Sequence, residues 1–313
     1  MQKIKQVIKR ITPEKVWTRL FRIRRFVRKT NFSARRFVRK TKNNFEEGKK
    51  IVVTFRNFPL LLAFWSGVAR NRKILTAVLW NGVRYKIGNE KTNVFGGFTT
   101  VVREVWEDGT YRLSKIGPPT PEIVFDIGAH VGVFSVYAAQ KFPGVSVYSF
   151  EPDPQNFELL RQNITLNGFE DRIHPFQLAI SAKSGIHDFF RSKFRSTSNS
   201  LFERSINNSK GYGKVKVESR TLEEIFEQEK IDRCDLLKMD CEGAEFEILL
   251  NAPPDVLRRI RRIALEYHDG VTNHDHKDLS RFLRANGFTV EVKPFNNIGE
   301  VSRGSLIAVM ERF

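Results

Sequence analysis

The sequence predicts an α/β fold in which a mostly parallel sheet is covered by helices on both faces. From residue 122 onward, short apolar segments alternate with segments that carry a helical pattern of apolar residues, and this alternation is typical of βαβ units. Several apolar segments end in a carboxylate or a glycine turn, as expected where parallel strands open toward a ligand. A basic helical arm and a small β-hairpin appendage are predicted to precede this sheet.

Each predicted strand is a short apolar run, and several predicted helices are bounded by a recognisable cap. Thr221 and Glu224 have the spacing of a capping box, and Gly168 and Gly287 follow helices as C-terminal caps. Residues 288–292 and 305–310 are expected to pair as a final antiparallel hairpin. The predicted strands are 123–125, 145–150, 174–180, 235–239 and 260–266, and the predicted helices are 131–142, 154–167, 222–229, 244–250 and 279–286.

Charge divides the 313-residue chain into a basic arm and a nearly neutral body. Residues 1–50 carry 18 Lys and Arg against three Glu, whereas the rest of the chain carries 35 against 32 acidic residues. The segment 1–45 places apolar side chains at helical spacing among its cations and repeats RRFVRKT at 24–30 and 35–41. This pattern suits an anionic membrane surface. A solvated arm, or a helix packed on the body, is an equally open interpretation, and nucleic acid ranks third.

Composition excludes several classes of protein. The 20 Gly and 12 Pro are too few for a collagen-like or low-complexity chain. Cys234 and Cys241 form no CxxC motif, so neither a disulfide framework nor a structural zinc site is expected. The apolar segment 58–69 is shorter than the roughly 20 residues that a bilayer span needs. The expected location is cytoplasmic, with the segment 1–45 able to bind the inner face of the membrane peripherally.

The region between the arm and the sheet is predicted to be a separate appendage. Asn81 and Gly82 separate two apolar runs and are a strong hairpin signal, and a short helical run follows at 103–106. The Gly-Pro-Pro sequence at 117–119 is the best boundary between this region and the sheet. The predicted organisation is a basic arm at 1–50, an appendage at 51–120 and a catalytic domain at 121–313.

The first two strands of the sheet end in residues that suit a nucleoside-containing cofactor. In the sequence DIGAHVG, Gly128 permits a tight turn, Gly132 lets the next helix pack closely, and N–H groups at the helix start can bind an anionic group. Glu151, at the end of the next strand, can accept hydrogen bonds from both hydroxyls of a ribose. The G-x-G-x-x-G spacing of the dinucleotide fingerprint is missing.

Acidic side chains gather at two later strand ends. The sequence DCEGAE places Asp240, Glu242 and Glu245 around a helix start, where acids are also stabilised by the helix dipole. Asp240, at the strand end itself, is the preferred functional residue. The sequence LEYH ends another strand with Glu266 and His268, and neighbouring acids raise the basicity of an imidazole.

Five segments make residues 122–310 resemble the FkbM-type family of S-adenosylmethionine-dependent methyltransferases: VFDIGAHVGVFS, VYSFEPDPQNFELLRQNI, LAISAKSG, SNSLF, and LLKMDCEGAEFEIL followed by IALEYH. The resemblance implies a class I methyltransferase fold, which is a Rossmann-like sheet of seven strands whose last hairpin is antiparallel. It also implies S-adenosylmethionine as the cofactor and O-methylation of a hydroxyl on a sugar, glycolipid or natural product. The residues that it assigns are Asp126, Gly128 and Gly132 at the methionine part of the cofactor, Glu151 at the ribose and Ala179 near the adenine.

Methyl transfer to a hydroxyl requires alignment of the reactants and a base for the hydroxyl proton. We expect His268 to be this base, with Asp240 orienting either the imidazole or the substrate. This preferred assignment contains no metal. The second-ranked assignment makes Asp240, Glu266 and His268 ligands of a divalent metal that lowers the pKa of the hydroxyl. The loop 192–213 is expected to cover the acceptor or, equally, to be a plain surface loop.

Three other functions remain open from the sequence. A nicotinamide-dependent oxidoreductase would use the same kind of sheet, an RNA-directed methyltransferase would explain the basic arm, and a non-catalytic membrane adaptor would need the arm alone. The expected partners are a small-molecule, sugar or lipid-linked acceptor and, through residues 1–45, an anionic membrane surface. Nucleic acid is not expected as a partner.

Overall fold

The computed structural model describes residues 55–57, 74–88, 94–106, 111, 119–192, 199–203, 212–295 and 302–311. The chain divides into two compact units, 1–49 and 50–313, and all described residues belong to the second. The predicted basic arm, its RRFVRKT repeat and the apolar segment 58–69 therefore lie outside the described residues. Within the described ranges, no helix combines the length and the apolar character needed to cross a membrane.

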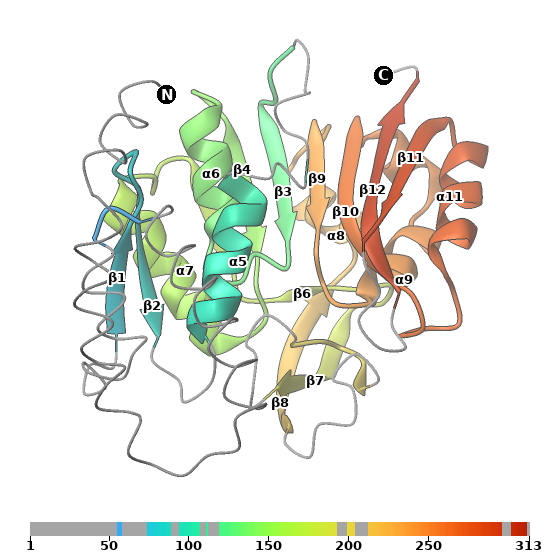
Figure 1. The fold of residues 1–313 in the computed structure, drawn as a ribbon. Coiled ribbons are helices and arrows are strands. Elements are labelled where there is room, and N and C mark those ends of the chain that lie inside the picture. Colours follow the sequence, from blue (N-terminus) through green and yellow to red (C-terminus); the bar gives the residue numbers. More distant parts are fainter. Residues whose placement is uncertain are drawn as a thin grey trace. The chain divides into compact units, whose positions relative to one another are not determined.

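A seven-stranded sheet forms the centre of the part of the chain that the structure describes (Figure 1). The five strands β10, β9, β3, β4 and β5 run parallel, and β12 and β11 extend the β10 edge by antiparallel pairing. This arrangement confirms the predicted fold class and the final antiparallel hairpin. In order across the sheet, the strands are β11 (Phe288–Pro294), β12 (Arg303–Met310), β10 (Arg262–His268), β9 (Leu236–Met239), β3 (Ile123–Ile127), β4 (Ser146–Phe150) and β5 (Ile173–Phe176).

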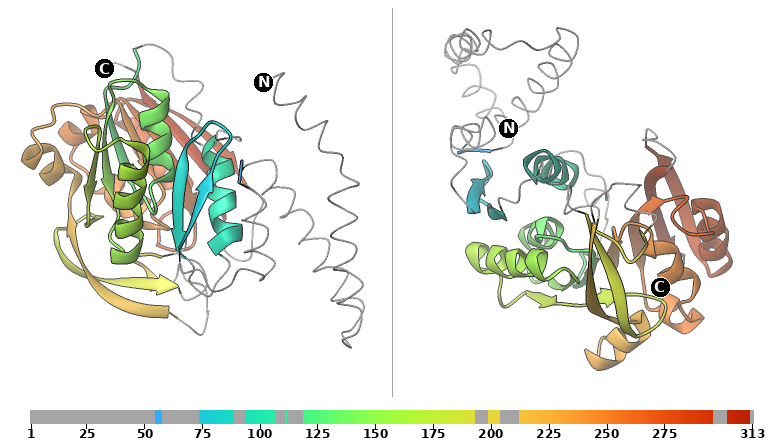
Figure 2. Two further views of the ribbon diagram at one scale, coloured as in Figure 1. Left: turned by 90° about the vertical axis from the view of Figure 1, so that its left-hand side faces the viewer. Right: turned by 90° about the horizontal axis from the view of Figure 1, so that it is seen from below.

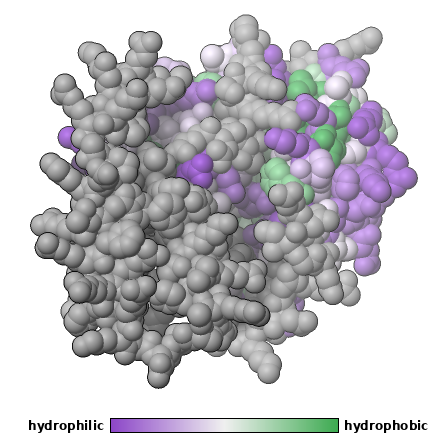
Figure 3. Space-filling model, viewed as in Figure 1, coloured by the Kyte–Doolittle hydropathy of each residue, from purple (hydrophilic) through white to green (hydrophobic). Residues whose placement is uncertain are grey.

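Helices cover both faces of this sheet (Figure 2). Because successive strand residues point to opposite faces, Val124 of β3 packs into one core and Phe125 into the other. The outward face of α11 is hydrophilic, as expected for a helix packed by one side (Figure 3). The first core contains α5 (Val94–Trp106), α6 (Val133–Lys141) and α7 (Pro154–Asn167), and the second contains α8 (Leu222–Gln228), α9 (Ala244–Leu250), α10 (Pro254–Arg258) and α11 (His276–Ala285).

Local capping explains why several helices begin and end where the sequence predicts. The Asp153 side chain accepts hydrogen bonds from the first turn of α7, and Gly168 ends this helix with a φ of 69°. The Thr221 side chain accepts a hydrogen bond from the backbone N–H of Glu224 at the start of α8. The helix α11 begins three residues before the predicted helix 279–286, because Asp275 and Asp278 form a capping box there.

A three-stranded sheet, which the sequence pattern does not predict, stands beside the central sheet. The predicted strand 174–180 is divided into β5, which pairs with β4, and β6 (Ala179–Ile180), which pairs with β8 (Tyr212–Arg220). The strand β7 (Gly185–Ser192) pairs antiparallel with β8 along its whole length. The two residues between β5 and β6 therefore carry the chain from one sheet to the next, at the edge where the cofactor site was predicted.

The predicted hairpin consists of β1 (Ile74–Val78) and β2 (Arg84–Gly88). In its turn Gly82 has a φ of 91°, and Asn81 is not among the residues with positive φ. The hairpin is held against α7, because Asn163 accepts from the Lys86 N–H and Asn167 exchanges two hydrogen bonds with the backbone of Arg84. Side chains of β1, β2 and α5 thus share a hydrophobic core with the central sheet.

Candidate functional site

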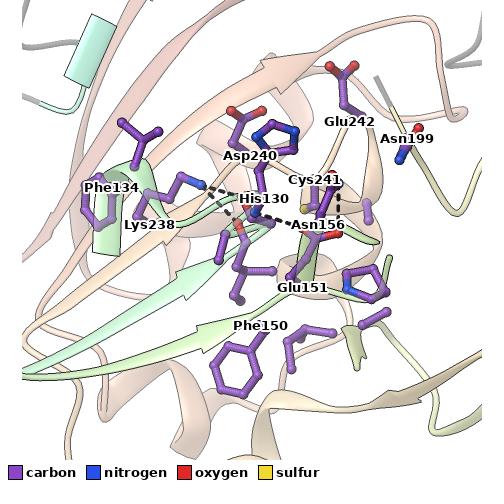
Figure 4. A pocket seen from close by; sticks show the side chains of 18 of the residues that line it. His130, Phe134, Phe150, Glu151, Asn156, Asn199, Lys238, Asp240, Cys241 and Glu242 are labelled. Atoms are coloured by element: carbon purple, nitrogen blue, oxygen red, sulfur yellow. Dashed lines mark hydrogen bonds between the residues drawn. The ribbon is translucent and has the colours of Figure 1, made fainter. Parts of the chain in front are cut away.

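A cavity of about 850 Å³, counted with its opening to solvent, lies at the carboxyl ends of β3, β4 and β9 (Figure 4). Four of the predicted site residues line it, namely Gly128, Glu151, Ala179 and Asp240. The turn after the first strand and the carboxylate that ends the second strand therefore converge on one cavity, as the sequence predicts. Three predicted residues, Asp126, Gly132 and His268, are not among the residues that line it.

Gly128 is required by a close approach of two strand ends. Its φ is 74°, and a Cβ atom at this position would lie 2.0 Å from the backbone oxygen of Asp240. The N–H groups of Gly128 and Ala129 both donate to the carbonyl oxygen of Phe150, and the N–H of His130 donates to Glu151. These three N–H groups therefore join the ends of β3 and β4, and the turn acts as the floor of the cavity.

Replacing Gly128 by alanine is expected to lower the free energy of unfolding by about 2–3 kcal/mol, because a positive φ and a backbone overlap both become unfavourable. Gly144 is a matched control, since its φ is 84° and a Cβ atom added there would meet no atom within 4 Å. Gly144→Ala should cost about 1 kcal/mol. Urea denaturation measures both values, and equal losses would contradict the close approach as the cause.

Asp126 and Gly132 do not line the cavity, but each contacts residues that hold its lining in place. Asp126 is fully buried, forms an ion pair of 2.9 Å with Lys238 and accepts a hydrogen bond of 2.5 Å from Ser135. A Cβ atom on Gly132 would lie 2.5 Å from Cδ1 of Leu160 in α7, so this glycine lets α6 and α7 approach each other. The structure therefore shows both residues in positioning roles, and their predicted contact with a cofactor stays a prediction.

Glu151 offers a buried carboxylate at the end of β4. Its side chain accepts hydrogen bonds from the backbone N–H groups of His130 and Asp153 and from Nδ2 of Asn156. Burial raises the pKa of Glu151 to about 7, although these hydrogen bonds act in the opposite direction. A carboxylate held this way can accept further hydrogen bonds from two hydroxyl groups in the cavity.

Two further lining residues, Lys238 and Tyr111, were not predicted. Lys238 is 3% exposed, and its Nζ lies 2.9 Å from both Asp126 and the carbonyl oxygen of Gly128. Burial alone would lower the pKa of Lys238, but Asp126 and Asp240 raise it above its ordinary value. The hydroxyl of Tyr111 donates to Oδ2 of Asp240 at 3.3 Å. With Val101 and Val105 of α5, Tyr111 forms a wall of the cavity.

His268 lies at the end of β10 among three carboxylates. Its ring nitrogens are 3.3 Å from Glu245, 3.5 Å from Glu242 and 3.6 Å from Glu266. Burial alone would lower the pKa of His268, but these three carboxylates raise it to about 10. Burial, followed by repulsion from Asp240, raises the pKa of Glu266 to about 8. The imidazole is therefore positively charged at neutral pH.

The segment 199–203 contributes two residues to the cavity lining and is held there by hydrogen bonds. Asn199 and Leu201 line the cavity, and Nδ2 of Asn199 donates to Asp153 at 3.2 Å. Ser200 pairs with Phe190 of β7, and its hydroxyl donates to the backbone oxygen of Glu242 at 2.8 Å. Two residues of the predicted loop 192–213 therefore line the cavity, and its predicted role in covering the acceptor stays a prediction. Residues 193–198 and 204–211 lie outside the described residues.

Comparisons with known proteins show the family of this chain. The model of the "Methyltransferase FkbM domain" matches residues 126–290. The 31-O-demethyl-FK506 methyltransferase FkbM of Streptomyces tacrolimicus is 27% identical over 213 residues, covering 60% of this chain and 80% of that protein. The hexuronic acid methyltransferase AglP of Haloferax volcanii is 24% identical over 206 residues, covering 62% and 78%.

Among solved structures, the methyltransferase FkbM of Methylobacillus flagellatus KT is 15% identical with a TM-score of 0.46, covering 66% of this chain and 47% of that one. The family match spans more than half of the chain and contains the cavity floor, Glu151, Lys238, Asp240 and His268. It supports a methyltransferase over the oxidoreductase and the non-catalytic adaptor as the interpretation of this sheet. The chain accordingly belongs to the FkbM family of S-adenosylmethionine-dependent methyltransferases.

Proposed function

We propose that this enzyme transfers a methyl group from S-adenosylmethionine to a hydroxyl of a sugar, glycolipid or other natural product. The observation that carries the proposal is the division of the cavity: Glu151 lies on one side, and Asp240 and Glu242 lie on the other (Figure 4). A buried carboxylate suits a ribose, whereas the acids on the other side suit a hydroxyl that must lose a proton. The printed names of two relatives, an O-demethyl substrate and a hexuronic acid, support a hydroxyl acceptor.

The cavity residues fit an adenosyl group by their chemistry. Glu151 would accept hydrogen bonds from the two ribose hydroxyls. Phe150, which precedes Glu151, also lines the cavity, as do Ala179 and Ile180, and these apolar side chains suit the adenine ring. Gly128, whose carbonyl oxygen is held by Lys238, would leave room for the methionine part above the cavity floor.

Asp240 is our proposed base and His268 supports it. Asp240 lines the cavity and is only partly buried, whereas His268 is buried and carries a proton at neutral pH. The base role that the sequence suggests for His268 therefore stays a prediction, and the charge of the imidazole favours Asp240. Tyr111 orients the Asp240 carboxylate by its hydrogen bond of 3.3 Å.

When bound, S-adenosylmethionine supplies a methyl carbon that forms a bond to the acceptor oxygen, while the carbon–sulfur bond breaks and its electron pair stays on sulfur. Asp240 takes the hydroxyl proton, so the products are a methyl ether, a neutral thioether and a protonated carboxyl group that solvent later deprotonates. The wall formed by α5, Tyr111 and the segment 199–203 limits the entry of water and holds the acceptor in place.

The proposal is tested by incubating the full chain with S-[methyl-³H]adenosylmethionine and separate pools of glycans, glycolipids, small hydroxylated metabolites and RNA. We expect label in a hydroxylated compound, and the label should survive mild alkali, because ethers resist the hydrolysis that removes methyl esters. Asp240→Asn should bind S-adenosylhomocysteine but transfer label more slowly. Label confined to RNA, or lost in alkali, would contradict an ether-forming enzyme.

A further inference from the structure

Asp240 and Glu242 lie on the side of the cavity opposite Glu151 (Figure 4), and together with His268 they form a cluster of possible metal ligands. Asp240, Glu242 and His268 each offer one ligand atom, and these atoms lie within 4.8 Å of one another. Asp240 and Glu242 line the cavity, and His268 adjoins them at the end of β10. Two strand ends that the sheet brings together, β9 and β10, therefore supply the whole group.

One atom of this cluster points to a cation independently of the acids. Nε2 of His268 is buried, the side chain is 1% exposed, and this nitrogen has no hydrogen-bond partner within the described residues. It lies 3.5 Å from Oε2 of Glu242 and 3.6 Å from Oε1 of Glu266. A buried nitrogen that lies near carboxylates but makes no hydrogen bond is uncommon in proteins and calls for an explanation. A cation bound between the nitrogen and these oxygens would provide one.

The other ring nitrogen is held in the manner typical of a metal-binding histidine. Nδ1 of His268 lies 3.3 Å from Oε1 of Glu245. Glu245 is fully buried and also accepts hydrogen bonds from the backbone N–H groups of Cys241 and Gly243. Metal-binding histidines commonly donate their second ring N–H to such a carboxylate. Glu245 therefore fixes the ring with Nε2 directed toward Glu242 and Glu266.

The balance of charge around the imidazole also favours a cation. Four carboxylates lie close together here, and Arg303 forms ion pairs with two of them, at 3.1 Å with Glu242 and at 4.0 Å with Glu266. Lys238 is already paired with Asp126 at 2.9 Å. Within the described residues, the acids of this cluster thus outnumber the permanently charged basic groups in contact with them.

We propose that Asp240, Glu242 and His268 bind one divalent cation, with Glu266 beside it as a further ligand. The imidazole is protonated before the cation binds, and it releases its Nε2 proton to solvent when the metal–nitrogen bond forms. Two carboxylates and one imidazole suit Mn²⁺ or Zn²⁺ better than Mg²⁺, which prefers oxygen ligands alone. With metal–ligand bonds of about 2.1 Å, tetrahedral ligand atoms lie about 3.4 Å apart. The ligand atoms of this cluster, which are within 4.8 Å of one another, therefore need to approach by up to about 1.4 Å. In its catalytic role, which rests on the proposed function, the cation would bind the acceptor hydroxyl and lower its pKa, and the second oxygen of Asp240 would take the proton.

The test is metal binding by untagged, full-length protein after treatment with a chelator. Mn²⁺ is titrated into the protein, and the signal of free Mn²⁺ is followed by electron paramagnetic resonance, with Zn²⁺ and Mg²⁺ as competitors. We expect one Mn²⁺ per chain, displacement by Zn²⁺, no displacement by millimolar Mg²⁺, and a Kd raised at least tenfold in Asp240→Asn and in His268→Gln. His274→Gln, which alters an exposed histidine, should bind Mn²⁺ as the unmodified protein does.

Binding of S-adenosylhomocysteine, measured by calorimetry without metal, keeps the two proposals separate. Should His268→Gln fail to fold, Asp240→Asn decides alone, since its side chain is partly exposed and of the same size. The metal site is overturned if the unmodified protein binds no stoichiometric Mn²⁺, or if folded variants bind it equally well. Those results would not affect the proposed methyltransferase function. Failure of the unmodified protein to bind S-adenosylhomocysteine would contradict the proposed function and not the metal site.

Discussion

Lys238→Met is expected to lower the free energy of unfolding by about 3–5 kcal/mol, the typical cost of removing one partner of a buried ion pair. Methionine has nearly the shape of lysine, so little packing is lost. The Asp126 carboxylate, however, would stay fully buried with only the Ser135 hydroxyl as a partner on Oδ2. The carbonyl oxygen of Gly128 would also lose its hydrogen bond from Nζ. Chemical denaturation followed by circular dichroism measures the loss.

Two controls separate burial from charge in this experiment. Lys216 forms an ion pair of the same 2.9 Å length with Asp188, but its side chain is 68% exposed, so Lys216→Met should change stability by less than about 1 kcal/mol. The double variant Lys238→Met/Asp126→Asn should recover part of the loss, because it removes the unpaired charge. Equal effects at the two lysines, or no recovery in the double variant, would contradict this explanation.

Glu151→Gln is expected to raise the Kd for S-adenosylhomocysteine about 100-fold, since a hydrogen bond to a charged group contributes about 1.5–3 kcal/mol. Glutamine keeps the size of the side chain but offers one acceptor oxygen in place of two. Glu158, which is exposed on the helix α7 that follows, provides the matched control, and Glu158→Gln should leave the Kd unchanged. Isothermal titration calorimetry at pH 8 measures the Kd for the unmodified protein and the two variants.

The pKa of about 7 at Glu151 also predicts how binding depends on pH. Ribose hydroxyls donate to the ionised carboxylate, and protonation removes an acceptor, so the Kd should rise about tenfold between pH 8 and pH 6. Because the folded protein favours the protonated form, the protein without ligand loses stability as pH rises through about 7. Glu151→Gln should abolish the pH dependence of binding, and a flat profile in the unmodified protein would contradict ribose recognition by this group.

The parts of the fold that depend on local sequence could be predicted well. Gly168 and Thr221 act through neighbours a few residues away, so the ends of α7 and the start of α8 were predicted to within a residue. The parallel strands are short apolar runs because both of their faces are buried. The three-stranded sheet was missed, since β6 has only two residues and its pairing with β8 joins segments about 40 residues apart.

In the candidate site, too, contacts between residues far apart in the sequence could not be predicted. Gly128, Glu151 and Asp240 directly follow strands β3, β4 and β9 and line the cavity, so their position at strand ends was enough to single them out. Lys238 lies within a strand, where its charge gives no sign that an ion pair with Asp126 buries it. The acids around His268 come from two strand ends, and only the folded sheet shows that Glu245 orients the ring while Glu242 and Glu266 face Nε2.

The wall formed by α5 and Tyr111 has a consequence for how such an enzyme can change. These residues precede the region 126–290 that the family shares, yet Tyr111 donates a hydrogen bond to Asp240, the base that we propose. Part of the wall that we propose to hold the acceptor is thus encoded before the shared region, while the segment 199–203 lies within it. Substitutions in α5 and at position 111 would then change the acceptor that is bound, while the residues proposed to bind the methyl donor stay the same.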